Sequence, residues 1–342
     1  MNDIVAVTLL TGFLGAGKTT LINYFLTHHA DQSVAILENE FGAVNIDGAL
    51  LRGGENVSVV ELSNGCVCCS VRGEFTEALT ELLDKRQRGE LCFDRLIVET
   101  TGLADPAPVI QTFFVEPALR EALRLDAVVT LVDCQHILRQ LDEHPVAAAQ
   151  VGFADRILLS KTDACEPEIR DQVLERLTGI NNKAAVFQIT QGACPASLWL
   201  DLNAFELSDS NDISRGFHIV RADRLDSPDF SPFRRSARAE RSWDDAIQAH
   251  VLEGGELDLK RIGAFMESCV ERYGNDMLRY KGVLAIAGNP QRLIVQGVHK
   301  VVGFDYGSAW QPGEEMISRL VIIGRYLPLE ALRAEFAAAA SK

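Results

Sequence analysis

The sequence predicts an α/β protein in which a doubly wound, mostly parallel sheet is followed by a smaller C-terminal α+β sandwich domain. Three observations lead to this fold class. From residue 1 to about 205, short apolar runs alternate with segments whose apolar residues recur at helical spacing. A glycine-rich loop separates the first apolar run from the first helical segment. After a polar stretch at 206–215 the order changes to a strand, a helix, several strands and a last helix.

In the first part of the chain, nearly continuous apolar runs of strand length indicate strands that are buried on both faces of a parallel sheet. Helical segments lie between them, which indicates that helices cover both faces of the sheet. We expect strands at Ile4–Leu10, Ser33–Glu38, Arg95–Glu99, Ala127–Asp133, Arg156–Ser160 and Ala185–Ile189, with helices at Thr19–His29, Glu74–Gln87 and Pro167–Leu177.

The second part is predicted to be a separate domain. Glu206–Arg215 is rich in Ser, Asp and Asn, which is typical of a linker, and the insert Ser227–Arg241 fits no regular element. We therefore expect domains at 1–205 and 246–342, with a linker and insert at 206–245. Within the second domain we expect strands near Ala246–Leu252, Val283–Ala287, Arg292–Val302 and Ser318–Leu327, and helices at Leu257–Tyr273 and Pro328–Ala340.

Composition excludes several classes of function. The chain carries 33 Lys and Arg against 48 Asp and Glu, a net charge of −15, which argues against a nucleic acid partner. No apolar run reaches the ~20 residues of a membrane span, and the N-terminus lacks the basic flank of a secretory signal. We therefore expect a cytoplasmic protein without a membrane partner. In that compartment its eight cysteines should be thiols.

The glycine-rich loop has the G-x-x-x-x-G-K-[ST] pattern of a phosphate-binding P-loop, between a strand and a helix as that loop requires. Its backbone N–H groups and the helix N-terminus favour bound phosphate, and Lys18 is placed to reach the β- and γ-phosphates. The Thr19 hydroxyl is the expected Mg²⁺ ligand. The nucleotide-binding residues predicted here are Gly12, Phe13, Leu14, Gly15, Ala16, Gly17, Lys18, Thr19 and Thr20.

Two later strand ends complete the expected nucleotide site. Glu99 ends an apolar strand, where a carboxylate can serve Mg²⁺ and the attacking water, and Gly102 can donate its N–H to the γ-phosphate. Ser160-Lys-Thr-Asp163 follows another strand. The Asp163 carboxylate can accept two N–H bonds from guanine but not from adenine, while the stem of Lys161 covers the base. The sequence therefore predicts a GTP/GDP site and a P-loop GTPase domain, with Lys18, Thr19 and Glu99 as catalytic residues.

Three thiols lie within four residues at Cys66-Val-Cys68-Cys69. Three thiolates and one further ligand suit tetrahedral Zn²⁺ and are poorly matched to Mg²⁺. Glu38 or Glu40, or a water, is the candidate fourth ligand. A redox pair and simple buried cysteines are the alternatives. Because Glu38 and Glu40 lie between the P-loop and Glu99, we hypothesise that zinc affinity depends on the γ-phosphate.

These motifs together resemble the CobW-like family of metal-handling P-loop GTPases, most closely its bacterial zinc-chaperone members. The resemblance covers nearly the whole chain, through Thr11–Leu21, Glu38–Gly42, Asn64–Cys69, Glu99–Pro108 and Ser160–Asp163, and through Arg279–Gly282, Gln296–Val298 and Arg319–Gly324 in the second domain. It implies slow GTP hydrolysis to GDP and phosphate, linked to delivery of zinc from the CxCC motif to a client metalloprotein. Nucleotide- or metal-dependent self-association is a further expectation.

Three alternatives stay open at this stage. A zinc- or redox-sensing GTP switch would keep its ion and regulate a partner. A chaperone for another metal, such as cobalt, would share the same motifs, and the chain lacks the His-rich metal-loading tract that many family members carry. A small-molecule P-loop kinase would need a basic lid, for which the Arg234–Arg241 cluster is the candidate.

Overall fold

A computed structural model describes residues 4–29, 32–39, 57–61, 71–205, 219–221 and 247–341. The chain divides into two compact units. The first comprises Met1–Leu177, Ala184–Ala204 and Phe217–Ala239, and the second comprises Thr178–Lys183, Phe205–Gly216 and Glu240–Lys342. The predicted zinc ligands Cys66, Cys68, Cys69 and Glu40, and the insert Ser227–Arg241 with its arginines, lie outside the described residues.

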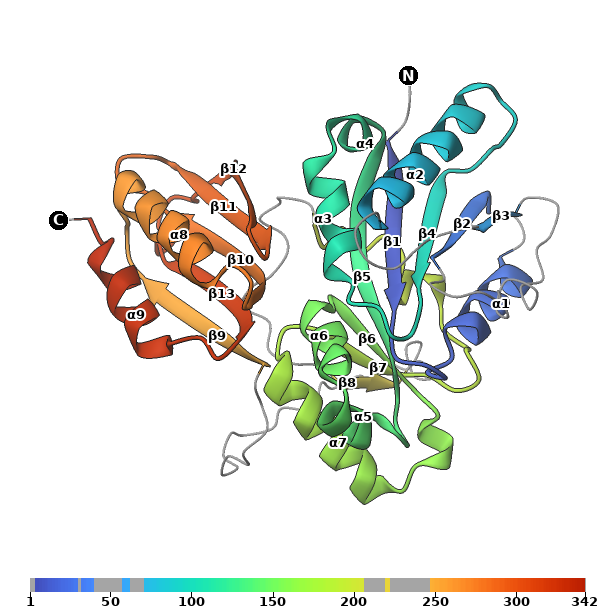
Figure 1. The fold of residues 1–342 in the computed structure, drawn as a ribbon. Coiled ribbons are helices and arrows are strands. Elements are labelled where there is room, and N and C mark those ends of the chain that lie inside the picture. Colours follow the sequence, from blue (N-terminus) through green and yellow to red (C-terminus); the bar gives the residue numbers. More distant parts are fainter. Residues whose placement is uncertain are drawn as a thin grey trace. The chain divides into compact units, whose positions relative to one another are not determined.

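The first unit contains an eight-stranded sheet in the order β3-β2-β4-β1-β5-β6-β7-β8, and every neighbouring pair is parallel (Figure 1). This order confirms the doubly wound α/β fold. The strands are β1 Val5–Thr11, β2 Val34–Asn39, β3 Val57–Glu61, β4 Arg95–Thr100, β5 Leu123–Asp133, β6 Arg156–Ser160, β7 Ala185–Gln188 and β8 Ile219–Arg221. β3 and β8 are absent from the strands we expected, and β8 falls within the stretch assigned to linker and insert.

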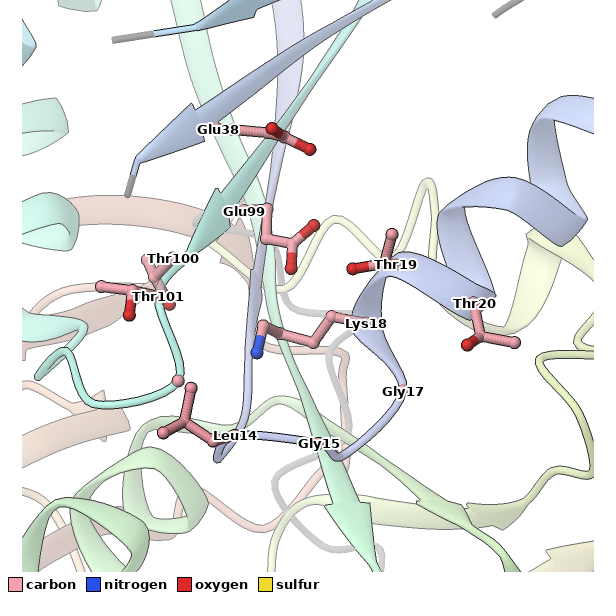
Figure 2. A pocket seen from close by; sticks show the side chains of 11 residues that line it. Leu14, Gly15, Gly17, Lys18, Thr19, Thr20, Glu38, Glu99, Thr100 and Thr101 are labelled. Atoms are coloured by element: carbon pink, nitrogen blue, oxygen red, sulfur yellow. The ribbon is translucent and has the colours of Figure 1, made fainter. Parts of the chain in front are cut away.

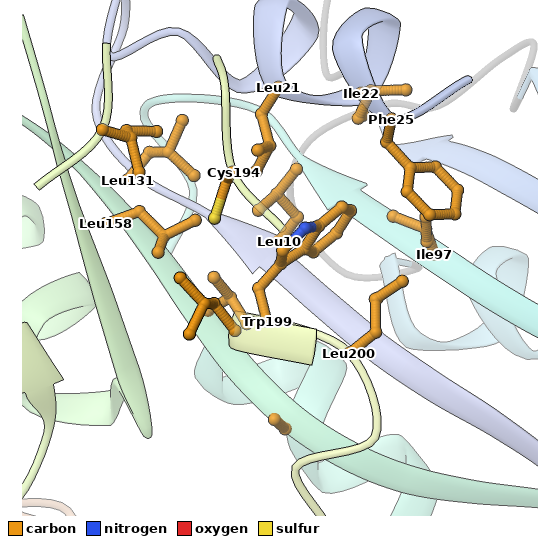
Figure 3. Packing of buried hydrophobic residues seen from close by; sticks show 14 of the residues in the cluster. Leu10, Leu21, Ile22, Phe25, Ile97, Leu131, Leu158, Cys194, Trp199 and Leu200 are labelled. Atoms are coloured by element: carbon orange, nitrogen blue, oxygen red, sulfur yellow. The ribbon is translucent and has the colours of Figure 1, made fainter. Parts of the chain in front are cut away.

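Helices connect these strands, and the central strands β2, β4, β1, β5 and β6 are largely buried on both faces. The helices are α1 Lys18–His28, α2 Val71–Gln87, α3 Ala107–Val115, α4 Pro117–Ala122, α5 Ile137–Glu143, α6 Pro145–Phe153 and α7 Pro167–Ile180, with short 3₁₀ turns at Thr162–Ala164 and Ala196–Leu198. On one face, α1 packs its Phe25 against the fully buried Trp199, with ring centroids 5.5 Å apart (Figure 3). Leu10 and Ile97 belong to this cluster, whereas their strand neighbours Leu9 and Val98 are buried on the opposite face.

The second unit is an antiparallel five-stranded sheet in the order β12-β11-β10-β13-β9 with two helices, which confirms the expected α+β sandwich. Helices and sheet share one apolar core in which Phe265 and Phe336 make an edge contact. The elements are β9 Ile247–Gly254, α8 Leu259–Tyr273, β10 Met277–Ala285, β11 Gln291–Val298, β12 Val301–Ala309, β13 Ser318–Arg325 and α9 Leu329–Ala338.

One expected strand of this unit was wrong. The stretch Arg292–Val302 is a hairpin, in which β11 turns into β12 through His299 and Lys300, and Val298 pairs with Val301. His299 adopts a left-handed conformation with φ 51°. The turn uses a non-glycine residue there, so the sequence lacks the Asn-Gly or Gly-Gly signal that usually reveals a hairpin. β10 also begins six residues before the expected Val283, at Met277.

None of the helices in the described part of the chain combines the length and hydropathy needed to cross a membrane.

Candidate functional site: a nucleotide pocket

The glycine-rich loop joins the end of β1 to the start of α1, as the sequence predicts. Gly12 has φ 137°, and a Cβ on it would lie 2.3 Å from the Leu131 carbonyl oxygen, so only glycine fits this close approach to β5. Gly17, with φ 101°, immediately precedes the helix. Lys18 begins α1 and donates from Nζ to the Gly12 carbonyl at 3.0 Å. The loop is thus folded over the lysine that we expect to contact phosphate.

Two buried carboxylates lie at the carboxyl ends of neighbouring strands above this loop. Glu38 on β2 and Glu99 on β4 are register partners and are 4% and 6% exposed. Figure 2 shows both side chains directed toward the side where α1 begins, with the Glu99 carboxylate facing the Thr19 hydroxyl and the Lys18 stem. Ligands of open α/β sheets bind at this edge, beyond the carboxyl ends of the strands.

One pocket brings most of the predicted nucleotide residues together. Its lining comprises Leu14, Gly15, Gly17, Lys18, Thr19, Thr20, Glu38, Glu99, Thr100, Thr101 and Gly102 (Figure 2). Gly12, Phe13 and Ala16 belong to the same loop without lining this pocket. Cationic, hydroxyl and carboxylate groups therefore converge on one hollow at the helix N-terminus, which is a suitable environment for a phosphate with its metal ion.

The segment after Glu99 is packed directly against the P-loop. A Cβ on Gly102 would lie 2.4 Å from the Leu14 backbone nitrogen, so the two backbones touch at this glycine. Below them, Thr100 donates its hydroxyl to the Thr11 hydroxyl at 2.9 Å, which joins β4 to β1. Thr100 and Thr101 also line the pocket, and neither was predicted from the sequence. The available signal was their position inside the motif Glu99-Thr-Thr-Gly102.

The predicted base-reading loop follows β6 and is tied to the P-loop by one side chain. Ser160 donates its hydroxyl to the Ala16 carbonyl at 2.7 Å. Lys161 adopts a left-handed backbone with φ 55°, and its Nζ lies 2.7 Å from Asp133 Oδ2. Asp163 is exposed on the following 3₁₀ turn. Lys161 and Asp163 do not line the phosphate pocket, and their roles toward guanine stay predictions.

Asp133 at the end of β5 contacts the predicted base-reading loop, and this residue was not predicted from the sequence. Burial opposes its ionisation, but hydrogen bonds from Lys161 Nζ, from His136 and from the Gln135 N–H outweigh burial and hold the pKa of Asp133 below its usual range. The His136 Nδ1 lies 2.9 Å from Asp133 Oδ2. Asp133 is therefore an anionic anchor for Lys161. Nothing in the motif Ser160–Asp163 reveals it, because it comes from a different strand.

The donor set of the pocket suits Mg²⁺. Thr19 offers a hydroxyl, while Glu99 and Glu38 offer carboxylates, and hard oxygen ligands are those that Mg²⁺ prefers. Within the described ranges no group of three His, Cys, Asp or Glu side chains is arranged to hold a metal ion. Of the predicted zinc ligands only Glu38 can be placed, and it lies in the nucleotide pocket.

Comparison with known proteins agrees with this geometry. Residues 6–188 match the model of the CobW/HypB/UreG nucleotide-binding domain, and residues 247–340 match that of the cobalamin synthesis protein cobW C-terminal domain. The zinc chaperone YjiA of Escherichia coli is 39% identical over 98% of this chain and 99% of its own. The zinc-regulated GTPase metalloprotein activator 1 of Saccharomyces cerevisiae is 29% identical over 96% of this chain and 82% of its own.

A solved structure also resembles the whole chain. The Zn(II)-bound YjiA GTPase from E. coli matches with a TM-score of 0.78 at 34% identity, covering 99% of this chain and 100% of that one. With one family model spanning the sheet that carries the nucleotide pocket and a second spanning the C-terminal sandwich, the chain belongs to the CobW/HypB/UreG family.

Proposed function

We propose that this chain is a GTP-hydrolysing metallochaperone that binds zinc at Cys66-Val-Cys68-Cys69 and transfers the ion to client proteins in a GTP-dependent way. The family membership and the names of the relatives, a zinc chaperone and a zinc-regulated GTPase, support this proposal. The proposed activity combines hydrolysis of GTP to GDP and phosphate with transfer of a metal ion. Residues near the nucleotide couple the hydrolysis to the transfer.

In this proposal the P-loop and Lys18 stabilise the negative charge that develops on the transferred phosphoryl group. Thr19 and Glu99 hold Mg²⁺, which when bound neutralises charge on the β- and γ-phosphates. Glu99 also orients the attacking water, and Gly102 donates its N–H to the γ-phosphate. Asp163 selects guanine while Lys161 covers the base. The assignment of domains at 1–205 and 246–342, with a linker and insert at 206–245, is part of the same proposal.

One observation supports the proposed coupling between nucleotide binding and zinc binding. Glu38, a candidate zinc ligand, lines the same pocket as Lys18 and Thr19 and is the register partner of Glu99. In the sequence Glu38 precedes the segment that contains all three clustered cysteines. A carboxylate that faces the nucleotide can change its partner when a γ-phosphate and Mg²⁺ arrive, which makes zinc affinity depend on the nucleotide.

The proposal includes a client metalloprotein as recipient and self-association that depends on nucleotide or metal. The proposal also includes a cytoplasmic location, because a zinc site made of thiolates needs a reducing environment. The described cysteines Cys92, Cys134, Cys165, Cys194 and Cys269 are free, and thiolate ligands persist where the environment is reducing.

The decisive experiment is titration of Zn²⁺ into the reduced protein against a chromophoric chelator, once with GDP and once with a non-hydrolysable GTP analogue. The same titration is run on a Cys66/Cys68/Cys69→Ala variant and on Glu38→Gln. Co²⁺ replaces Zn²⁺ in a parallel series. We expect zinc binding that requires the cysteines and changes with the nucleotide, and we expect Glu38→Gln to weaken the nucleotide dependence more than the affinity with GDP.

Transfer is tested separately, by adding a zinc-free acceptor protein to the loaded chain and following metal release as GTP is hydrolysed. Release that accompanies hydrolysis supports a chaperone. Retention of the ion through many turnovers would instead indicate a sensor that regulates a partner. Zinc binding that ignores both the cysteines and the nucleotide would overturn the proposal while leaving a GTPase.

A further inference from the structure

Gln150 on α6 is a buried amide whose two polar contacts both lie in the loop after Glu99. Gln150 is 1% exposed. Nε2 donates to the Gly102 carbonyl at 3.1 Å and to the Ala104 carbonyl at 3.1 Å. A primary amide has two N–H donors, so this geometry uses one for each carbonyl. The residue does not itself line the nucleotide pocket.

Gln150 is held firmly enough to act as an anchor. Its backbone carbonyl accepts from the Thr130 hydroxyl on β5 at 2.8 Å, which fixes α6 to the central sheet at this residue. The loop it holds has its own supports, since Ala104 donates to the Thr101 carbonyl and Asp105 accepts from the N–H of Ala107 at the start of α3. Between these points the Gly102 and Ala104 carbonyls are fixed by Gln150.

The residue at the N-terminal end of this helix contacts the P-loop. His144, immediately before α6, stacks on Phe13 with ring centroids 4.9 Å apart. The helix and the residue that precedes it therefore contact both loops of the phosphate site, through His144 at the P-loop and through Gln150 at the loop that contains Gly102. The two loops also touch each other directly, through the backbones of Gly102 and Leu14.

We propose that Gln150 is a positioning residue for GTP hydrolysis. By holding the carbonyls of Gly102 and Ala104, it presets the loop so that the Gly102 N–H faces the place of the γ-phosphate before GTP arrives. This role rests on the proposed GTPase function and deepens it. Positioning of this kind acts on the γ-phosphate, which GTP has and GDP lacks. Loss of Gln150 should therefore reduce the rate of GTP hydrolysis and the affinity for GTP, while the affinity for GDP hardly changes.

The test compares Gln150→Glu and Gln150→Leu with the wild type in the full chain. Glutamate keeps the shape but places a carboxylate against two carbonyl oxygens, whereas leucine removes both donors without adding charge. Leucine has a similar volume, so it serves where the glutamate variant fails to fold. The matched control is Gln140→Glu on the neighbouring helix α5, because Gln140 is also buried and its side chain makes no hydrogen bond to the loop at 101–105.

The measured quantities are kcat and KM for GTP, and the Kd values for GDP and for a non-hydrolysable GTP analogue. We expect kcat to fall about 10–100-fold in the Gln150 variants. The preference for the GTP analogue over GDP should fall with it, while the Kd for GDP stays close to that of the wild type. Gln140→Glu should keep the wild-type kcat and preference, even if its melting temperature falls.

Two results would overturn the role of Gln150. Hydrolysis at the wild-type rate in Gln150→Leu would do so, and so would an equal loss of GDP and GTP-analogue affinity, which indicates general damage to the site. A wild-type chain that neither hydrolyses GTP nor binds guanine nucleotides would instead overturn the proposed function, and this role with it. The wild-type measurement therefore separates the two failures.

Discussion

Lys161 and Asp133, which are 28 residues apart, are joined by an ion pair in which Nζ lies 2.7 Å from Oδ2. The Asp133 side chain is 3% exposed and the Lys161 side chain is 41% exposed, so the carboxylate is the buried partner and the ammonium the more exposed one. Asp133 ends β5 beside Ser160, its register partner on β6. The end of one strand thereby holds the loop that follows the next strand.

This ion pair predicts an effect of Asp133→Asn on nucleotide binding. The substitution keeps the shape of the side chain but removes the charge that pairs with Lys161, the residue that we propose covers the base. We expect the Kd for GDP to rise roughly three- to tenfold, since a half-exposed ion pair contributes about 1 kcal/mol. Fluorescent-nucleotide titration measures this. Asp142→Asn, which removes a surface ion pair with Arg176, is the control and should leave the Kd unchanged. Equal Kd values for Asp133→Asn and the wild type would contradict the anchoring role.

The lowered pKa of Asp133 predicts a dependence of stability on pH. The folded state holds this carboxylate ionised to a lower pH than the unfolded chain does, where the ordinary value is 3.8. The stability that it contributes is therefore fully present above that value and is lost as the pH falls through the lower folded-state pKa. Urea unfolding of the wild type and of Asp133→Asn from pH 6 down to about pH 3 measures the difference. We expect the advantage of the wild type to shrink on acidification, and an advantage that grows there would refute this linkage.

The contact between Gly102 and Leu14 predicts that Gly102→Ala separates two loops. The added Cβ would lie 2.4 Å from the Leu14 nitrogen and 2.7 Å from its Cα, and backbone atoms cannot rotate away as a side chain can. We expect kcat for GTP to fall on the order of 100-fold, because the loop would be displaced from the place that we propose for the γ-phosphate. Gly255→Ala is the matched control, since its Cβ meets no atom within 4 Å. Single-turnover hydrolysis at the wild-type rate in Gly102→Ala would show that the loops tolerate the separation.

Local patterns made the sheet and the P-loop predictable from the sequence. The strands of the first unit are apolar on both faces, as Leu9 and Leu10 illustrate, and that pattern needs no knowledge of distant residues. The loop from Gly12 to Thr19 is contiguous, so its residues are found together by their spacing. The hairpin at His299 was not predicted, and the reason is equally local. Its left-handed residue is a histidine and not one of the glycine or asparagine residues that usually indicate such a turn.

Contacts between distant segments were not predictable in the same way. Gln150 contacts a loop 48 residues earlier in the chain, and Asp133 contacts Lys161 across 28 residues. Either side chain, seen alone in the sequence, looks like an ordinary helix or strand-end residue. Their roles follow only from the strand order, which places the ends of β4, β1, β5 and β6 side by side.

Two glycines of the second unit predict stability changes of opposite sign. Gly263 lies inside α8, where an added Cβ meets no atom within 4 Å, so Gly263→Ala should raise the free energy of unfolding by about 0.5–1 kcal/mol through helix propensity.

Gly297 on β11 is the register partner of Tyr280, and a Cβ there would lie 2.2 Å from the tyrosine ring. That ring cannot easily move, because the residue is 1% exposed and its hydroxyl donates to the Val301 carbonyl at 2.9 Å. Gly297→Ala should therefore lower the free energy of unfolding by about 1–3 kcal/mol. Urea unfolding of the full chain, with hydrogen exchange reporting on the C-terminal unit, tests both the Gly263→Ala and the Gly297→Ala predictions. A Gly297→Ala variant as stable as the wild type would mean that the sheet relaxes around Tyr280, contrary to the tight packing of that ring.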